Sequence, residues 1–297
     1  MVKRVLRPAL LMGLVVLPSF ASSYSSSKPT ARTDYYVSLG DSYAVGYQPA
    51  PREAATSGYT AVVARATHLT LANFGCAGAT TASILETKGC RGRYGPAALR
   101  GAVTYSNKSQ AAAAEAFIRS HHGHIGLITI TIGGNDITNC GSTSNVVPCF
   151  TSAISAIQKD VATLASGLRS AAGTRTPIIG LTYPDVLLGS WVYPPSAPNH
   201  NLASLSVTVF KNYINPALMS AYAKSQGHFV DITAATGAYT PLTETATQVP
   251  YGTIPKAVAQ VCNLTWYCTR GSIHANTAGY KFIGQQVVAE YNMLRAS

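Results

Sequence analysis

Residues 126–136 read Gly-Leu-Ile-Thr-Ile-Thr-Ile-Gly-Gly-Asn-Asp, and this stretch decides the fold class. Its apolar and β-branched run ends at a Gly-Gly turn, which is typical of a strand followed by a loop. Because the run is nearly continuous rather than alternating, it predicts a strand buried on both faces, as in a parallel sheet. Asn135 then follows directly at the carboxyl end of the strand.

Four more short runs have the same character and predict further strands, at residues 35–39, 70–74, 177–182 and 229–232. Longer segments of helical character fall at residues 58–67, 110–120, 153–171, 205–224 and 277–295. Five strands with intervening helices predict one α/β domain, a three-layer α/β/α arrangement around a five-stranded parallel sheet. Ligands of such sheets bind beyond the carboxyl ends of the strands.

The first residues have the three-part layout of a secretory signal peptide. Lys3, Arg4 and Arg7 precede an apolar run at residues 9–20, and small residues follow at 21–23. The run is well short of the roughly 20 residues that span a bilayer as a helix. We therefore predict a signal peptide at residues 1–23, a flexible Ser-rich leader at 24–33 and a secreted, extracellular domain at 34–297.

Six cysteines fall into three pairs that are local in sequence. In an exported protein this favours three local disulfides, although six cysteines allow about 15 pairings and spacing alone does not select one. None of the pairs has the spacing of a zinc knuckle, so we predict no metal site. The disulfide candidates are Cys76, Cys90, Cys140, Cys149, Cys262 and Cys268.

The formal net charge of +11 favours solubility and attraction to anionic surfaces. A basic cluster at Lys88, Arg91, Arg93 and Arg100 is interpreted as a solvated loop, with contact to an anionic lipid or polymer as the alternative. No helix or aromatic platform accompanies this cluster, so nucleic acid is not a predicted partner.

The triplet Gly40-Asp41-Ser42 follows the first predicted strand. A serine at the end of a buried strand, after a glycine and an aspartate, is held in a tight turn with its hydroxyl toward the ligand-binding edge. The same triplet also makes ordinary turns, so it does not identify a nucleophile by itself. Ser42 is a candidate nucleophile on this pattern.

Two further loops carry candidate oxyanion donors. After the second strand, the backbone amide of Gly78 lies in a glycine-rich turn that a ligand can approach closely. After the third strand, the side-chain amide of Asn135 can donate to the same developing charge. The alternative for the Gly78 loop is an ordinary strand-to-helix turn with a threonine as the helix cap. The alternative for Asn135 is an asparagine that only stabilises a turn or caps a helix.

A candidate general base, His274, lies just before the last predicted helix. A histidine in such a loop suits proton transfer near neutral pH. Another histidine group, at residues 121–124, precedes the third strand and so falls at the opposite edge of the sheet.

Together the four blocks resemble the SGNH, or GDSL, hydrolase family, whose members carry Ser, Gly, Asn and His in this order at strand ends. The resemblance spans residues 36–280 and implies a flavodoxin-like fold. It implies Ser42 as nucleophile, His274 as base, and an oxyanion hole made by the Ser42 amide, Gly78 and Asn135. No cofactor is implied. The cysteine pairs and the export signal are most similar to the secreted lipases and esterases of actinobacteria.

One position departs from the family pattern, because the aspartate expected three residues before the histidine is Gly271 here. No acidic residue lies between Glu244 and His274. Either a main-chain carbonyl of Gly271 or Ser272 orients the ring of His274, or Asp185, beyond the fourth strand, supplies the acid.

The predicted function is a secreted carboxylic-ester hydrolase, a lipase or esterase, acting as a monomer through an acyl-enzyme on Ser42. Its substrate is an ester of a lipid, a phospholipid or an acetylated glycan. Residues 187–198 either line an acyl groove or pack as an ordinary loop, and residues 234–270 shape the cleft near His274. The alternatives are a secreted binding protein without turnover, which the missing acid favours, and an acyltransferase or phospholipase using the same site.

Overall fold

The computed structural model describes residues 1–2, 34–49, 58–90, 101–142 and 144–296. Nearly all of the predicted signal peptide and the whole leader lie outside these ranges, as do Arg91, Arg93 and Arg100 of the basic cluster. Backbone contacts group residues 33–297 into one compact unit, which contains every strand and helix of the described ranges.

A five-stranded parallel sheet forms the centre of this unit. Its strands are β1 (Tyr35–Gly40), β2 (Thr70–Asn73), β3 (Ile125–Thr131), β4 (Ile178–Leu181) and β5 (His228–Val230). The spatial order is β2-β1-β3-β4-β5, with every pairing parallel. The predicted sheet is confirmed, and the strand ends differ from the predicted ones by two residues at most.

The strand order places a topological switch point between β1 and β3. After β1 the chain forms β2 along one edge of β1, and it later forms β3 along the opposite edge of β1. In doubly wound sheets of this order, the crevice at such a point is where ligands bind. Ser42 follows β1 and Asn135 follows β3, so the sheet topology itself brings these two loops to the same crevice.

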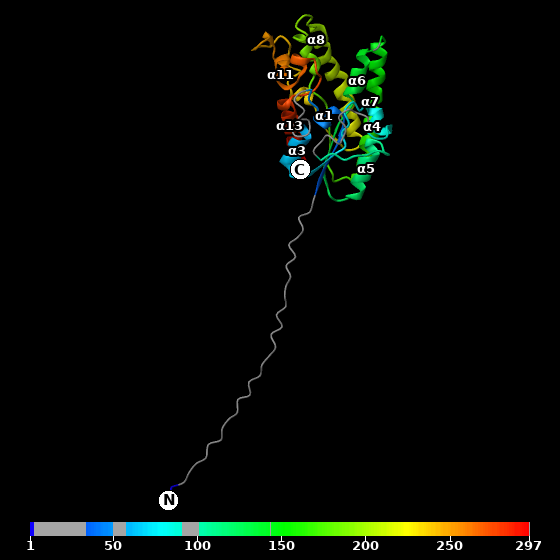
Figure 1. Ribbon diagram of the computed structural model, residues 1–297, viewed down its shortest axis with the longest axis vertical. Helices are drawn as coiled ribbons and strands as arrows, with labels where there is room; N and C mark the ends of the chain where they lie inside the picture. The colour runs from blue at the N-terminus through cyan, green and yellow to red at the C-terminus, as the bar shows by residue number, and fades with distance from the viewer. Residues whose placement is uncertain (3–33, 50–57, 91–100, 143, 297) are drawn as a thin grey trace. The chain divides into compact units, whose positions relative to one another are not determined.

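Helices cover both faces of the sheet (Figure 1). On one face, α3 (Tyr59–Thr67) and α13 (Thr277–Ala296) pack on a core that includes Tyr36 and Leu127. On the other face, Val37 and Ile128 pack against a second set of helices. That set is α4 (Thr81–Glu86), α5 (Gln110–Ser120), α7 (Val146–Ala172) and α9 (Asn215–Ala223). The predicted three-layer α/β/α arrangement is confirmed.

Two predicted helices differ in extent from the observed ones. Helix α7 begins at Val146 rather than at residue 153, and Pro148 is tolerated there because the amides of the first turn have no intrahelical partner. The helix predicted at 205–224 is instead three segments: α8 (His200–Val209), a π-helical turn η4 (Phe210–Ile214) and α9. Pro216 would clash with the carbonyl four residues earlier in a regular helix, and the wider π turn just before it relieves this conflict.

A smaller cluster of elements, of which the sequence predicted only part of α8, packs around Leu188 and Val258. It includes the 3₁₀ turn η3 (Val186–Trp191), α8, the antiparallel hairpin β6–β7 (Thr245–Gln248 and Gly252–Pro255) and α11 (Lys256–Leu264). The short helix α12 (Tyr267–Arg270) follows and leads to the loop that carries His274.

The three local disulfides are confirmed as Cys76–Cys90, Cys140–Cys149 and Cys262–Cys268. Each lies near one of the loops singled out from the sequence. Cys76 belongs to the loop of Gly78, Cys140 follows the short helix that carries Asn135, and Cys268 lies in α12, shortly before His274.

Candidate active site

Ser42 is the first residue of the short helix α1 (Ser42–Val45) and is almost fully buried. Asp41 caps this helix, because its carboxylate accepts a hydrogen bond from the Tyr43 amide at 2.9 Å. Gly40 makes the turn possible, since it has φ +138° and any Cβ there would collide with the carbonyl oxygen of Thr131. The strand end and the cap together fix the position of the Ser42 hydroxyl.

The Oγ of Ser42 lies 2.9 Å from Nε2 of His274, which is hydrogen-bonding distance. The loop of His274 is held from two sides. The main-chain carbonyl of His274 accepts a hydrogen bond from the Trp266 amide at 2.9 Å, and the Tyr43 hydroxyl donates to the carbonyl of Ile273 at 2.7 Å. The structure therefore brings together the two residues proposed from the sequence as nucleophile and base.

The other ring nitrogen of His274, Nδ1, lies 3.1 Å from the hydroxyl of Ser272. The sequence had suggested a main-chain carbonyl of Gly271 or Ser272 as this partner; the hydrogen bond found goes to the side chain of Ser272. Gly271 ends α12 with φ +63°, and a Cβ there would come within 2.7 Å of the Tyr193 ring. Backbone and packing thus disfavour an aspartate at this position.

Asp185 takes part in a different contact. It precedes η3, is fully buried, and its carboxylate accepts a hydrogen bond from the Ser206 hydroxyl at 2.8 Å. Burial raises the pKa of Asp185 to about 7, although the Ser206 hydrogen bond opposes this. Within the part of the chain that the structure describes, no hydrogen bond joins Asp185 to His274, so the geometry gives it no role in orienting the ring.

Burial lowers the pKa of His274 to about 4. Its Nδ1 has the hydroxyl of Ser272 and no carboxylate as hydrogen-bond partner within the described ranges, so no negative charge there offsets the cost of burying the imidazolium. At neutral pH the ring is uncharged and one of its nitrogens is free to accept a proton.

The candidate oxyanion donors lie on loops that are joined to each other. Cys76 donates its amide to the Gly40 carbonyl at 2.9 Å, which places the loop of Gly78 beside the Ser42 turn. Gly78 has φ +83° and open space where a Cβ would stand. Asn135, in α6 (Gly134–Thr138), donates through Nδ2 to the Ala79 carbonyl at 2.8 Å. The amide nitrogen has a second hydrogen that this bond does not use.

Asp136, which the sequence analysis did not single out, links the same two loops. Its carboxylate accepts from the amide of Thr81 at 3.0 Å and from the hydroxyl of Thr81 at 2.7 Å. Thr81 is the first residue of α4, directly after the Gly78 loop. The sequence shows that Asp136 directly follows Asn135, but it does not show that the partner of the Asp136 carboxylate is Thr81.

Tyr183, at the end of β4, was also missed. Its hydroxyl donates to the Asp41 carboxylate at 2.7 Å and accepts from the Gly134 amide at 3.2 Å. Burial raises the pKa of Asp41 to about 7 against the Tyr183 hydrogen bond. In the sequence, a tyrosine after an apolar strand is indistinguishable from an ordinary core residue, so no signal pointed to this role.

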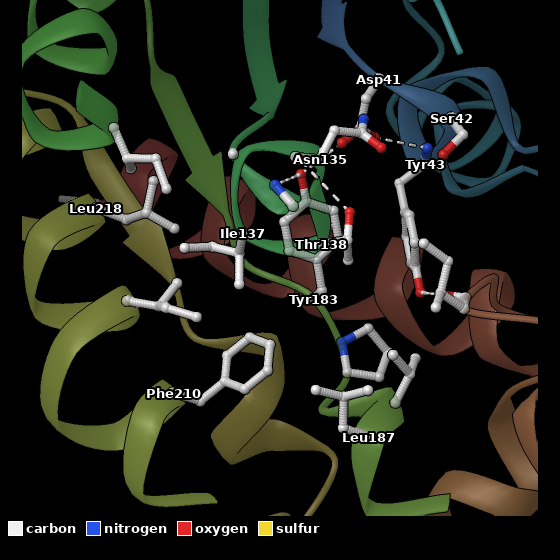
Figure 2. A pocket seen from close by; sticks show the side chains of 17 residues that line it. Asp41, Ser42, Tyr43, Asn135, Ile137, Thr138, Tyr183, Leu187, Phe210 and Leu218 are labelled. Atoms are coloured by element: carbon white, nitrogen blue, oxygen red, sulfur yellow. Dashed lines mark hydrogen bonds between the residues drawn. The ribbon is translucent and has the colours of Figure 1, made fainter. Parts of the chain in front are cut away.

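An apolar cavity opens beside Ser42 and Asn135 (Figure 2). Of residues 187–198, proposed as an acyl groove or an ordinary loop, only Leu187 is among the described residues that line it. From residues 234–270, Trp266 contacts the His274 loop through its backbone amide and also donates its indole N–H to Gln48 at 3.1 Å. That segment therefore supports the loop of the histidine.

The described ranges also bear on metal binding and membrane insertion. No group of three or more His, Cys, Asp or Glu side chains in those ranges is arranged to hold a metal ion. Among the helices that the structure describes, none is long and apolar enough to cross a membrane.

Several solved structures are similar in fold. An extracellular lipase from Streptomyces rimosus aligns at 19% identity and TM-score 0.51, covering 87% of this chain and 99% of the lipase. A phospholipase A1 from Streptomyces albidoflavus aligns at 17% identity and TM-score 0.52, covering 87% and 98%. A lipase from a goat rumen metagenome aligns at 17% identity and TM-score 0.52, and the alignment covers 86% of this chain and 97% of that lipase. At these identities the similarity establishes the fold.

A sequence comparison with curated proteins finds no match. The model of the GDSL-like lipase/acylhydrolase family, in contrast, matches residues 38–282, from β1 into α13, and includes the loops of Ser42, Gly78, Asn135 and His274. The chain therefore belongs to the GDSL-like lipase/acylhydrolase family and is a carboxylic ester hydrolase.

Proposed function

We propose that this protein is a secreted serine lipase or esterase in which Ser42 is the nucleophile and His274 the general base. The observation that carries the proposal is the 2.9 Å separation between Ser42 Oγ and His274 Nε2. A nucleophile within hydrogen-bonding reach of an uncharged base, itself oriented by a third group, is the arrangement that acyl transfer needs.

In this mechanism Ser42 attacks the ester carbonyl while His274 takes the hydroxyl proton through Nε2. The amides of Ser42 and Gly78 and the Nδ2 of Asn135 stabilise the oxyanion of the tetrahedral intermediate. The resulting imidazolium protonates the leaving alcohol, and an ester bond to Ser42 remains. Water, deprotonated by the same histidine, then releases the carboxylic acid and restores Ser42.

Ser272 has the role that a carboxylate has in most triads. If Nδ1 of His274 carries the ring proton, it donates to the Ser272 hydroxyl, and Nε2 is left as the acceptor facing Ser42. A neutral hydroxyl fixes the tautomer without adding negative charge. The imidazolium formed during turnover is therefore stabilised less than it is in a Ser-His-Asp triad.

The extracellular setting and the lipid nature of the substrate rest on several observations. The N-terminal sequence has the layout of a signal peptide, and three disulfides suit an oxidising compartment. Two structurally similar proteins are described as an extracellular lipase and a phospholipase A1. We propose secretion, a monomeric state and a long-chain or medium-chain acyl ester as substrate, without a cofactor.

Labelling with a serine-directed fluorophosphonate tests the proposal. The wild-type protein should be labelled and should hydrolyse p-nitrophenyl esters, whereas Ser42→Ala should lose both. Ser204→Ala, which changes a helix serine bonded only to the His200 carbonyl, provides the matched control. An unlabelled wild-type protein, or a Ser42→Ala variant that retains labelling, would refute the assignment.

A further inference from the structure

The cavity beside Ser42 opens to solvent, and its empty space, counted together with the solvent at its mouth, is about 670 Å³. Ser42 and Asn135 border it at one side, and the helical residues Phe210 and Leu218 stand at the other (Figure 2). A substrate bonded to Ser42 with its oxyanion at Asn135 therefore has direct access to this space.

The walls of the cavity are almost entirely apolar. Its three titratable lining residues are Asp41, Tyr43 and Tyr183, within the part of the chain described. All three use their polar groups within the protein: Tyr183 donates to Asp41, Asp41 accepts from the Tyr43 amide, and the Tyr43 hydroxyl donates to Ile273. The hydroxyl of Thr138, which also lines the cavity, donates to the main-chain carbonyl of Asn135 at 3.4 Å. Apart from Ser42 and Asn135, the described lining is therefore mainly hydrocarbon, and a hydrocarbon chain fits it best.

The position of His274 decides which half of the ester enters. The leaving alcohol must lie near Nε2 of His274, because it receives the proton from that atom. His274 is not among the residues that line the cavity. The alcohol therefore departs on the histidine side of Ser42, and the acyl chain is the half left to occupy the cavity.

We propose that this cavity is the acyl-chain site and that Phe210 determines the longest chain it accepts. This inference rests on the proposed function of Ser42. The substrates of this site are fatty-acid esters, and its selectivity acts on the acyl chain rather than on the alcohol.

Phe210 owes its position to the π turn η4. The turn begins at Phe210, and Ile214 and Leu218, the next residues at four-residue spacing, also line the cavity. Tyr213, on the same turn, is instead 52% exposed. Single-turn π segments interrupt a helix at a cost and frequently occur at functional sites. Here the segment presents a large aromatic ring at the wall opposite Ser42, as Figure 2 shows.

A chain-length series gives the expected signature. Each methylene buried in an apolar site improves binding, so kcat/KM should rise about fourfold for every carbon added. The rise should stop at the length at which the chain meets Phe210. In Phe210→Ala the acyl-chain length with the highest kcat/KM should increase, and in Phe210→Trp it should decrease.

The test measures kcat/KM for p-nitrophenyl esters from acetyl to palmitoyl in the wild type and these variants. Tyr213→Ala is the matched control, because it removes an aromatic ring from the same turn but from its exposed side. It should retain the wild-type profile. If Phe210→Ala does not fold, as judged by circular dichroism, Phe210→Trp and Ile137→Trp narrow the cavity from two walls, and both should shorten the optimum.

A second series holds the acyl group constant as butyrate and varies the alcohol from methanol to octanol. Phe210→Ala should leave this alcohol profile unchanged. If it changes alcohol preference instead, or if its acyl profile equals that of the wild type, the assignment of the cavity is wrong while the ester hydrolase remains. If the wild type neither hydrolyses any ester nor reacts with the phosphonate, the proposed function itself has failed.

Discussion

At the scale of single residues, the environment of His274 distinguishes this site from a Ser-His-Asp triad. A buried imidazole whose Nδ1 contacts a serine hydroxyl has no nearby charge to stabilise its protonated form. Its pKa is lowered to about 4 by burial. A base must be deprotonated to act, so this histidine remains competent at pH values where an ordinary histidine would be protonated.

The pH dependence of kcat/KM should reflect this lowered pKa. The wild-type value should be nearly the same at about pH 5 and pH 7 and should fall as the pH approaches about 4, because His274 becomes protonated there. Steady-state hydrolysis of a soluble p-nitrophenyl ester across this range measures it, with product read after neutralisation. If kcat/KM instead fell on the acid side with a midpoint near the usual histidine pKa of about 6.5, the effect of burial on the pKa of His274 would be contradicted.

Two variants at Ser272 separate orientation from charge. Ser272→Ala removes the bond to Nδ1 and should lower kcat about fivefold, the typical value of one neutral hydrogen bond. Ser272→Asp supplies a carboxylate near the same nitrogen, so it should raise the pKa of His274 and move the acid limb of the pH profile upward. If neither variant changes kcat or the pH profile, Ser272 does not position the ring.

The sequence singled out Ser42 and His274 as candidates, and it named Ser272 only for its main-chain carbonyl, not for its side chain. The first two lie at the ends of predicted elements, where residue type and position carry information. The contact of Ser272 depends on the left-handed backbone at Gly271 and on the Tyr193 ring beside it, which bring a side chain rather than a carbonyl to Nδ1. A local turn geometry of this kind is not encoded in a residue pattern.

At the scale of secondary-structure elements, Tyr183 joins three strand ends. It follows β4, and its hydroxyl bridges the Asp41 carboxylate after β1 and the Gly134 amide after β3. The proposed nucleophile is the next residue after Asp41, and the proposed oxyanion donor Asn135 is the next after Gly134. In the proposed mechanism Tyr183 is therefore a positioning residue that sets the distance between these two groups.

Removing only this hydroxyl tests that role. Tyr183→Phe keeps the ring and its edge contact with Tyr43 but loses both hydrogen bonds, one of them to a carboxylate. Measured above about pH 8, where Asp41 is ionised, kcat should fall about tenfold with KM nearly unchanged, because hydrogen bonds to charged groups contribute about 1.5–3 kcal/mol.

The matched control is Tyr222→Phe, since the hydroxyl of Tyr222 is buried without a hydrogen-bond partner among the residues that the structure describes. It should retain the wild-type kcat and lose no stability. A Tyr183→Phe variant that loses stability while keeping its kcat would indicate a purely structural tyrosine.

The elements themselves were predictable to different degrees. The strands β1, β3 and β4 are buried on both faces over nearly their whole length, so each appears in the sequence as a nearly continuous apolar run. The hairpin β6–β7 has no such run, and its residues alternate between partial exposure and exposure in β6. The π turn at Phe210 was missed because its cause, Pro216, does not by itself end a long helical pattern. The residue that closes the proposed acyl site therefore lay inside a segment predicted as regular helix.

At the scale of the whole molecule, buried ionisable groups link stability to pH. Burial raises the pKa values of Asp41 and Asp185 from 3.8 to about 7, so the folded protein holds two protons that the unfolded chain releases above about pH 4. His274 acts in the opposite direction, because its pKa falls from 6.5 to about 4 and the unfolded chain binds that proton. From about pH 4.5 to 6, the folded state thus holds a net excess of about one proton.

The consequence is that stability should decrease as pH rises through this window. A raised folded-state pKa contributes its full stability below the unfolded value and loses it as pH passes the folded value. One proton of excess corresponds to about 1.4 kcal/mol per pH unit. The burial of Asp136, whose pKa is also raised, acts in the same direction. Urea unfolding of the oxidised protein at several pH values measures the slope.

Asp185→Asn separates the two roles that Asp185 could have. It removes one of the two buried protons, so the slope of the unfolding free energy against pH should become nearly flat, while the exposed-surface variant Glu244→Gln keeps the wild-type slope. Its kcat should stay near the wild-type value, because the carboxylate contacts Ser206 and not His274. A loss of activity approaching 10⁴-fold, as expected for the orienting acid of a triad, would instead place Asp185 in the catalytic machinery.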